Sequence, residues 1–250
     1  MKKKILVTGG GGFIGSHLVE TLIKDGHSVK TIVPYNPDNS WGWIDSFEPN
    51  IKKNLEIISG DICDQNLVSK LVKNVDVIFH LAALISIPYS YVSPRSYIST
   101  NIMGTLNLLE ASRNSNVELF VQTSTSEVYG SSQYSPIDEQ HPLNAQSPYA
   151  ATKIAADQLA LSYYRSFDLP VSIIRPFNTF GPRQSLRAFI PTIITQILSS
   201  KKKIKLGNLN SKRDFSYVSD TVRGFTSCIG KKKCLGQAIN LGTGVVFSMQ

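Results

Sequence analysis

The stretch Lys4–His17 reads KILVTGGGGFIGSH and decides the fold. A short apolar run meets four consecutive glycines, and a helical pattern begins directly after them at Phe13. We therefore expect a buried strand, a tight turn and the N-terminus of a helix. The unpaired N–H groups at such a terminus, with the positive end of the helix dipole behind them, form a site for a pyrophosphate.

The spacing of the glycines favours dinucleotide binding. The turn contains both Gly9-x-x-Gly12-x-x-Gly15 and Gly10-x-Gly12-x-x-Gly15. A Cβ at these positions would keep the backbone away from phosphate oxygens and the helix away from the strand. Glycines also occur in ordinary turns, but here they have the strand before them and the helix after them that a dinucleotide site requires.

Composition excludes several classes of protein. The chain has 250 residues and 42% hydrophobic residues, as a globular protein with one large core has. No apolar run is long enough to span a bilayer, so we expect no membrane partner. The three cysteines, Cys63, Cys228 and Cys234, form no CxxC pair. We therefore expect no metal site, no structural disulfide and a cytoplasmic location.

The formal charge of +8 comes largely from separate lysine runs at 2–4, 201–203 and 231–233. Nucleic-acid binding would require a basic stripe with interleaved aromatic residues or a known module. We therefore expect solvated lysines and no nucleic-acid partner. A positive field would still attract an anionic substrate.

Apolar strands and amphipathic helices alternate along the first half of the chain. We expect strands at 5–7, 29–33, 55–59, 75–80, 119–123 and 171–174, and helices at 13–24, 96–112, 149–167, 188–200 and from 221. This order predicts an α/β fold, a Rossmann-type doubly wound parallel sheet over residues 1–175. Such a sheet binds its ligand at the carboxyl ends of its strands.

The end of the second strand departs from the common NAD site, where an acidic residue holds the ribose hydroxyls. Here Pro34, Tyr35 and Asn36 follow the strand, and no arginine is present for a 2′-phosphate. We therefore expect NAD rather than NADP. Asp61, after the third strand, is either a polar contact near the adenine or the N-cap of a helix over 65–72.

Two polar clusters mark the site of chemistry. The run STSE at 124–127 comes directly after the fifth strand, although a polar turn would read the same way. Tyr149 and Lys153 are four residues apart and share one helical face. A lysine ammonium beside a tyrosine favours the phenolate, which can then take a proton from a hydroxyl. Tyr-x-x-x-Lys occurs by chance, but its combination with the glycine turn indicates a shared site.

Eight stretches together resemble the extended short-chain dehydrogenase/reductase superfamily, specifically its nucleotide-sugar epimerases and dehydratases. They extend over nearly the whole chain: TGGGGFIGSH at 8–17, GDICD at 60–64, FHLAA at 79–83, NIMGTLNLLEA at 101–111, TSTSEVYG at 123–130, SPYAATK at 147–153, RPFNTFGPRQ at 175–184 and RDFSYVSD at 213–220. Within this family, residues 35–45 and 87–91 look like the sugar-nucleotide 4,6-dehydratases of legionaminic acid and related nonulosonate pathways.

The resemblance implies NAD as the cofactor and a UDP-, GDP- or dTDP-linked sugar as the substrate. It implies four catalytic residues: Thr125, Glu127, Tyr149 and Lys153. The implied cofactor contacts are Gly9, Gly12, Phe13, Ile14, Gly15, Asp61, Ile62, Leu81, Ala82, Ala83, Ser124, Tyr149 and Lys153. The implied substrate contacts are Ser126, Asn178, Arg183 and Arg213, unless Asn178 is a turn residue and the arginines form surface ion pairs.

Glu127 favours the dehydratase branch. A 4-epimerase only oxidises and reduces C4, whereas a 4,6-dehydratase must also remove the C5 proton, for which a carboxylate is suited. UDP-glucuronate decarboxylases carry an arginine where this chain has Ile154. dTDP-glucose dehydratases carry Asp where this chain, like GDP-mannose dehydratases, has Ser126. Glu127 would then act as both base and acid.

We therefore predict a 4,6-dehydratase, a lyase of polysaccharide biosynthesis. The alternatives are a 4-epimerase or UDP-glucuronate decarboxylase on the same scaffold, or a truncated, non-catalytic NAD-binding protein. The last alternative stays open because the chain ends at Gln250, where relatives continue. We accordingly expect a partial substrate domain over 176–250, with later segments returning to the Rossmann core.

The resemblance also implies a homodimer, formed through a four-helix bundle of the helices at 96–112 and 149–166. The apolar residues that would meet there could equally belong to the core of one chain: Leu106, Leu109, Ile154 and Leu161.

Overall fold

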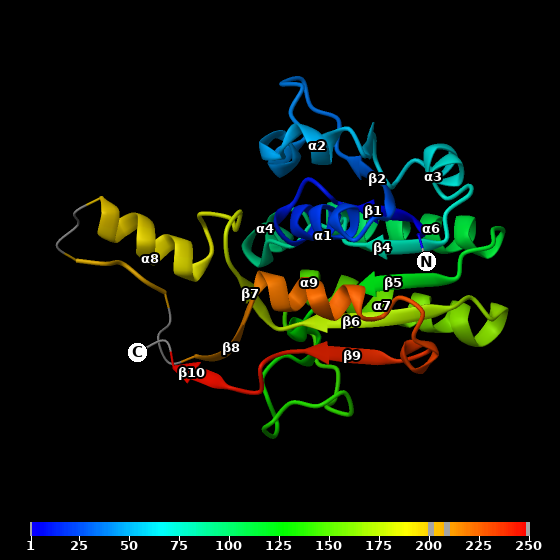
Figure 1. Cartoon of the computed structure of the whole chain (residues 1–250). Helices are drawn as coiled ribbons and strands as arrows, with labels where there is room; N and C mark the ends of the chain where they lie inside the picture. Colours follow the sequence, from blue (N-terminus) through cyan, green and yellow to red (C-terminus); the bar gives the residue numbers. More distant parts are fainter. Residues whose placement is uncertain (1, 200–202, 208–210, 249–250) are drawn as a thin grey trace.

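A computed structural model describes residues 2–199, 203–207 and 211–248 (Figure 1). Its α-helices are α1 (Phe13–Lys24), α2 (Pro49–Lys52), α3 (Gln65–Leu71), α4 (Ile87–Val92), α5 (Pro94–Tyr97), α6 (Gly104–Arg113), α7 (Pro148–Phe167), α8 (Phe189–Leu198) and α9 (Val218–Thr226). The shorter helical turns are η1 (Gly42–Ser46), η2 (Ile98–Met103), η3 (Ser126–Tyr129) and η4 (Lys232–Cys234). The strands are β1 (Lys4–Thr8), β2 (Ser28–Val33), β3 (Leu55–Ser59), β4 (Val77–His80), β5 (Leu119–Thr123), β6 (Val171–Pro176), β7 (Asn178–Phe180), β8 (Lys212–Tyr217), β9 (Ala238–Leu241) and β10 (Val246–Ser248).

The main sheet reverses its direction of growth at β1. Within the described residues its seven parallel strands have the order β3-β2-β1-β4-β5-β6-β9. The chain builds outward from β1 to β3 and then crosses back to β4 on the other side. Doubly wound folds bind dinucleotides in the crevice at the carboxyl ends of such a strand pair. The predicted Rossmann-type fold is confirmed.

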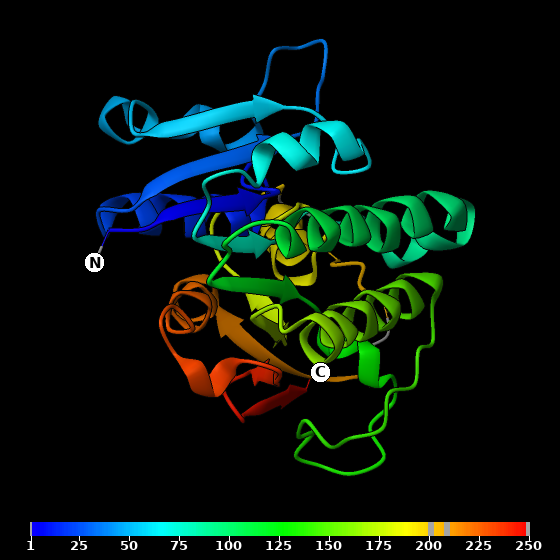
Figure 2. The ribbon, with the colours of Figure 1, turned by 90° about the vertical axis from the view of Figure 1, so that its right-hand side faces the viewer.

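Helices cover both faces of this sheet. α1 and α9 pack together on one face, and α3, α6 and α7 cover the other (Figures 1 and 2). Each face of the sheet has its own hydrophobic core. Alternate residues of a strand pack into one core or the other, because successive side chains of a strand point to opposite faces. Val7 and Phe79 join the core under α1 and α9, whereas Leu6 and Ile78 join the core under α3, α6 and α7.

The helix expected over 96–112 consists of α5, η2 and α6. The middle piece, η2, is a π-helix that contains the buried Asn101. The Asn101 side chain accepts a hydrogen bond from Leu84 N and donates one to Leu84 O, both at 2.9 Å. The helical period of the sequence does not predict this interruption or the contact that Asn101 makes with Leu84.

The residues proposed for a dimer bundle are divided between core and partly buried positions. Leu109 and Leu161 are buried in the core of this chain, and Leu106 packs against the same core. Ile154 is half-buried. The core alternative is therefore correct for at least two of the four residues, and the homodimer stays a prediction.

Residues 176–250 contribute to two sheets. β7, β8 and β10 form a separate small sheet in the order β10-β8-β7, while β9 pairs in parallel with β6. α8 projects away from the main sheet in Figure 1. Part of the expected helix at 188–200 and of the lysine run at 201–203 lies outside the described residues, as does Gln250. In the described part of the chain, no helix has the length and apolar character needed to cross a membrane.

Phe225 links α9 to the main sheet, and its removal tests that packing. The ring is fully buried and lies edge-on to Phe79, with 6.3 Å between centroids. We expect Phe225→Ala to lower the free energy of unfolding in urea by about 3–5 kcal/mol, because it leaves a cavity. The matched control is Phe247→Ala, whose ring is 52% exposed; its change should stay within about 0.5 kcal/mol. Equal losses in the two variants would contradict the packing.

Candidate active site

The glycine turn brings the end of β1 against the start of α1. Gly9 has φ +74°, and a Cβ added to it would lie 2.8 Å from Ala82 N. A Cβ on Gly15 would lie 2.2 Å from Gly9 O, so only glycine permits this approach. Gly12 is the N-cap of α1 and provides no side-chain cap. The predicted contacts Phe13 and Ile14 form the first two positions of that helix.

A second segment covers the same turn, and neither glycine spacing predicts it. Trp43 N donates to Gly11 O at 3.0 Å. A Cβ on Gly11 would lie 2.5 Å from Trp41 O, and one on Gly42 would lie 2.6 Å from Gly11 O. Gly11 and Gly42 are therefore required by the close packing of the segment 41–43 on the turn.

The polar residues near the expected adenine site have local partners. Asn36 organises the loop after β2, where its side-chain oxygen accepts two backbone N–H groups. Asp61 accepts from Cys63 N at 2.8 Å, whereas the N-cap of α3 is Asp64. The N-cap alternative for Asp61 is wrong, because the capping residue is the one directly before the helix. The contact of Asp61 and the buried Ile62 with a cofactor stays a prediction.

His80, at the end of β4, is part of a buried chain of hydrogen bonds. Burial, with the charge of Lys153 in addition, lowers the pKa of His80 to about 3, so the ring is neutral. Thr105 Oγ1 donates to Asn101 O at 2.7 Å. His80 Nε2, 3.0 Å from Thr105 Oγ1, therefore carries the hydrogen, and Nδ1 accepts from Thr8 Oγ1 at 2.7 Å.

This chain of hydrogen bonds connects the glycine turn with α7. At one end, Thr8 Oγ1 accepts hydrogen bonds from the backbone N–H groups of Leu81 and Ala82. The backbone of these two residues lies against Gly9. At the other end, Asn101 Nδ2 donates to Thr152 Oγ1 at 3.0 Å, and Thr152 Oγ1 donates to Tyr149 O at 2.8 Å. The predicted cofactor contacts Leu81, Ala82 and Ala83 are half-buried in this segment.

The four predicted catalytic residues meet where β5 ends against α7. Thr125 Oγ1 accepts from Glu127 N at 3.2 Å, and the Thr125 side chain is also hydrogen-bonded to Tyr149. The Glu127 carboxylate is half-buried and acts electrostatically on Tyr149. Lys153 Nζ donates to Thr123 O at 2.5 Å. This arrangement places the Tyr149 phenol beside the Thr125 hydroxyl and within the electrostatic influence of the Glu127 carboxylate.

Burial dominates the pKa values of these groups. It raises the pKa of Tyr149, against the hydrogen bond from Thr125, while the Glu127 charge raises it further. It lowers the pKa of Lys153 to about 8, against the attraction of Asp157. The expected lowering of the Tyr149 pKa by Lys153 is therefore wrong for the chain by itself. The lysine ammonium donates instead to a main-chain carbonyl of β5.

The two predicted serines have different surroundings. Ser124 is buried, and its Oγ donates to Asp157 Oδ2 at 2.7 Å. Its hydroxyl is therefore engaged inside the protein, and its contact with a cofactor stays a prediction. Ser126 is half-buried at the start of η3.

The predicted substrate contacts lie on separate elements. Asn178 begins β7 and is half-buried, and Arg213 is exposed on β8. Arg183 Nη2 donates to Glu20 Oε2 at 2.7 Å, and its guanidinium lies over the ring of Phe47. Arg183 thus forms the ion pair of the alternative interpretation, and binding a diphosphate would require it to exchange that partner.

Two buried charged residues behind the site were missed. Arg175 Nη2 lies 3.2 Å from Asp157 Oδ2, with 4% and 0% of their side chains exposed. The available signals were the position of Asp157 one helical turn after Lys153 and the position of Arg175 at the start of the RPFNTFGPRQ segment. Among the described residues, no cluster of three His, Cys, Asp or Glu side chains could hold a metal ion.

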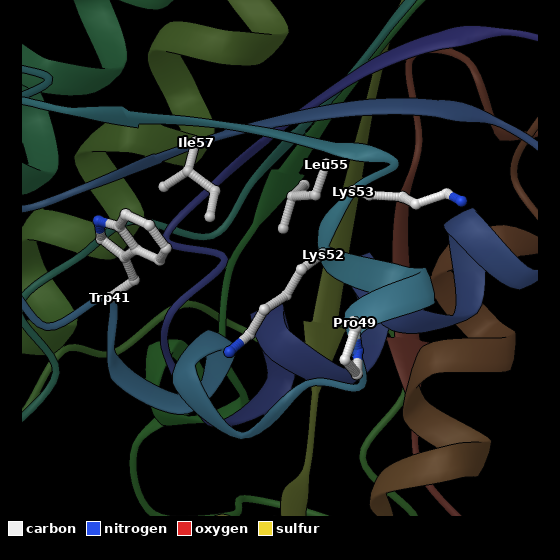
Figure 3. A pocket seen from close by; sticks show the side chains of 6 residues that line it. All are labelled: Trp41, Pro49, Lys52, Lys53, Leu55 and Ile57. Carbon is white, nitrogen blue, oxygen red and sulfur yellow. The ribbon is translucent and has the colours of Figure 1, made fainter.

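A surface hollow lies at the edge strand β3 (Figure 3). None of its lining residues is a predicted site residue, so we assign it no part in the candidate site. They are Trp41, Pro49, Lys52, Lys53, Leu55 and Ile57.

Similarity to known proteins extends over almost the whole chain. A family model described as GDP-mannose 4,6 dehydratase matches residues 6–250. The uncharacterized UDP-glucose epimerase YtcB of Bacillus subtilis is 37% identical over 243 residues, which cover 96% of this chain and 76% of that protein. The dTDP-D-glucose 4,6-dehydratase of Mus musculus is 34% identical over 250 residues, which cover 99% of this chain and 70% of that protein.

The fold is likewise similar to solved structures. One is a variant of UDP-glucuronic acid 4-epimerase from Bacillus cereus, in complex with UDP-4-deoxy-4-fluoro-glucuronic acid and NAD. It has a TM-score of 0.89 and 34% identity, with 98% of this chain and 79% of that chain covered. Dehydratases and epimerases therefore both occur among the relatives. The chain belongs to the NAD-dependent nucleotide-sugar epimerase/dehydratase family of the extended short-chain dehydrogenases/reductases.

Proposed function

We propose that this chain is an NAD-dependent nucleotide-sugar 4,6-dehydratase, a lyase that forms a 4-keto-6-deoxy sugar nucleotide. The observation that carries the proposal is the position of Glu127. Its N–H is held by Thr125, and its carboxylate acts on Tyr149. A dehydratase needs a base for the C5 proton beside the groups that oxidise C4, whereas a 4-epimerase does not. The murine relative, named for this reaction, supports the proposal.

The residues of the glycine turn fit NAD. The close approach at Gly9 and Gly15 leaves a cradle that a Cβ would fill, and Gly12 leaves the N-terminus of α1 without a side-chain cap. Such a terminus binds a pyrophosphate. The NAD-bound Bacillus cereus structure supports this choice of cofactor. When bound, oxidised NAD supplies a hydride acceptor for C4, returns the hydride at C6, and adds a positive charge that favours the Tyr149 phenolate.

Each of the four catalytic side chains has a defined role in this mechanism. Tyr149 takes the proton from O4 while Thr125 donates a hydrogen bond to the phenolic oxygen, and Lys153, one helical turn further along α7, supplies a positive charge to the site. Glu127 removes the C5 proton of the 4-keto sugar and passes that proton to the hydroxyl that leaves C6 as water. Glu127 then takes up a proton from solvent and returns it to C5, and Tyr149 releases the O4 proton to solvent. The sum of these steps is the loss of one water from the sugar.

A 4-epimerase is the second candidate, because the Bacillus cereus structure is of a UDP-glucuronic acid 4-epimerase and the Bacillus subtilis relative is named a UDP-glucose epimerase. Thr125, Tyr149 and Lys153 would suffice to oxidise and reduce C4. Glu127 would then be dispensable, so substitution of this residue separates the two reactions.

The glycine turn is tested by Gly12→Ala. The nearest atom to the added Cβ is Gly9 O at 3.3 Å, so the fold should tolerate the substitution. We expect the Kd for NAD, measured by calorimetry, to rise about tenfold, or about 1.4 kcal/mol. The control is Gly207→Ala, where the added Cβ meets no atom within 4 Å and φ is not positive. A Kd that rises equally in both variants, or in neither, would contradict pyrophosphate binding at this turn.

The role of Glu127 is tested by Glu127→Gln, which removes the base and keeps its shape. We expect formation of the 4-keto-6-deoxy product to fall about 10²–10⁴-fold. C4 oxidation should continue, so NADH absorbance should accumulate in the presence of sugar nucleotide. Glu118→Gln is the control, because Glu118 is exposed and paired with the distant Lys3. Product formation at the unsubstituted rate in Glu127→Gln would refute the assignment of the base.

A further inference from the structure

The buried pair Asp157 and Arg175 has no task in the reaction described so far. Arg175 Nε and Nη2 donate to Asp157 Oδ2 at 3.3 and 3.2 Å. Arg175 Nη1 donates to Tyr129 OH at 2.9 Å, and Tyr129 OH donates to Asn240 Oδ1 at 2.8 Å. Burying two charges carries a desolvation penalty that their attraction does not reliably offset, so stability alone is a weak reason for the pair.

The same carboxylate reaches the catalytic end of β5. Ser124 Oγ donates to Asp157 Oδ2 at 2.7 Å, and Lys153 Nζ donates to Thr123 O at 2.5 Å. Thr123, the last residue of β5, and Ser124 directly after it are therefore bound to two residues one helical turn apart on α7. These two bonds fix the position of α7 against β5 directly before Thr125.

Lys153 lies in surroundings that oppose its charge. Asp157 on α7 attracts its charge, the neutral His80 on β4 lies within its electrostatic influence, and Arg175 on β6 is paired with Asp157. Tyr149 lies one helical turn before Lys153 on α7. Burial favours the neutral amine, and a nearby carboxylate favours the ammonium. Asp157 is the carboxylate in this group, and its Oδ1 has no hydrogen-bond partner among the described residues. Burial raises the pKa of Asp157, whereas Arg175, Ser124 and Lys153 favour its charged form. The Asp157 carboxylate in turn raises the pKa of Lys153.

We propose that Asp157, held by Arg175, is a positioning residue that aligns the end of β5 with α7 and keeps Lys153 in its charged form. The proposal rests on the proposed function only in that the reaction uses a Lys153 ammonium. The charge state itself is a property of the free chain.

The test is Asp157→Asn, which keeps the side-chain shape and can still accept from Ser124. The ammonium of a lysine is present below its pKa and is lost as pH rises through that value. The pKa of Lys153, about 8 in the unsubstituted chain, should fall by about one unit or more. It is measured by NMR titration of the full chain with ¹³C-labelled lysine, and the Lys153 signal is identified by its loss in Lys153→Met.

Because Asp157→Asn leaves Arg175 unpaired, that variant is expected to be less stable. The double variant Asp157→Asn/Arg175→Met removes both charges and should recover stability, yet its Lys153 pKa should remain low. Ser124→Ala removes the hydrogen bond but keeps the carboxylate, so the Lys153 pKa should not fall. A Lys153 pKa that stays at the unsubstituted value in the double variant would overturn the proposal.

Turnover gives a separate readout. The alkaline limb of the kcat/KM profile should move to lower pH in Asp157→Asn, because the ammonium is lost earlier as pH rises. If the unsubstituted chain turns over none of the sugar nucleotides, the proposed function fails while the NMR result still decides the role of Asp157. An unshifted Lys153 signal in Asp157→Asn would reject that role whatever the activity.

Discussion

The approach of α1 to the Gly9 carbonyl, which leaves no room for a Cβ on Gly15, is the constraint on which the site depends. It places the uncapped N-terminus of α1 at the carboxyl end of β1, where the order of strands reverses. β4 runs alongside β1, and Thr8 holds the backbone after β4 through two N–H groups. A dinucleotide bound at this terminus would therefore lie over the ends of β4 and β5, beside the side chains for which we propose catalytic roles.

Burial has two opposite effects on the proposed reaction: it excludes water from the site, and it disfavours the charged forms of the side chains there. The surroundings that shield C4 oxidation from water push both Tyr149 and Lys153 toward their neutral forms. A neutral tyrosine cannot take the proton from O4, and a neutral lysine would leave the site without its ammonium. The buried carboxylate of Asp157 opposes the second effect. Burial raises the pKa of Asp157 itself, and the charge of the buried Arg175 guanidinium acts in the opposite direction. Charged side chains that do not contact the substrate can in this way influence the protonation state of the side chains in the proposed active site.

The parts of the molecule that follow local patterns could be predicted from the sequence. The glycine turn, the parallel strands and the cluster of Thr125, Glu127, Tyr149 and Lys153 depend on neighbouring residues and on strand ends that meet at one edge. Contacts between distant segments could not be predicted in this way. The segment 41–43 on Gly11, the π-helix at Asn101 and the pair Asp157 and Arg175 each join parts of the chain that no periodicity relates. The sequence pattern also does not locate the start of α3 correctly: Asp61 is one candidate for its N-cap, but the capping residue is Asp64, three positions further on.

The central claim is that the hydride taken from C4 returns to C6 of the same sugar after water has been eliminated. The most direct measurement is the mass and proton NMR spectrum of the product made in deuterium oxide from UDP-GlcNAc, GDP-GlcNAc or dTDP-glucose. The account predicts, for one of these substrates, a product that has lost one water and carries deuterium at C5. A C4 epimer that has lost no water and carries no deuterium at C5 would contradict it.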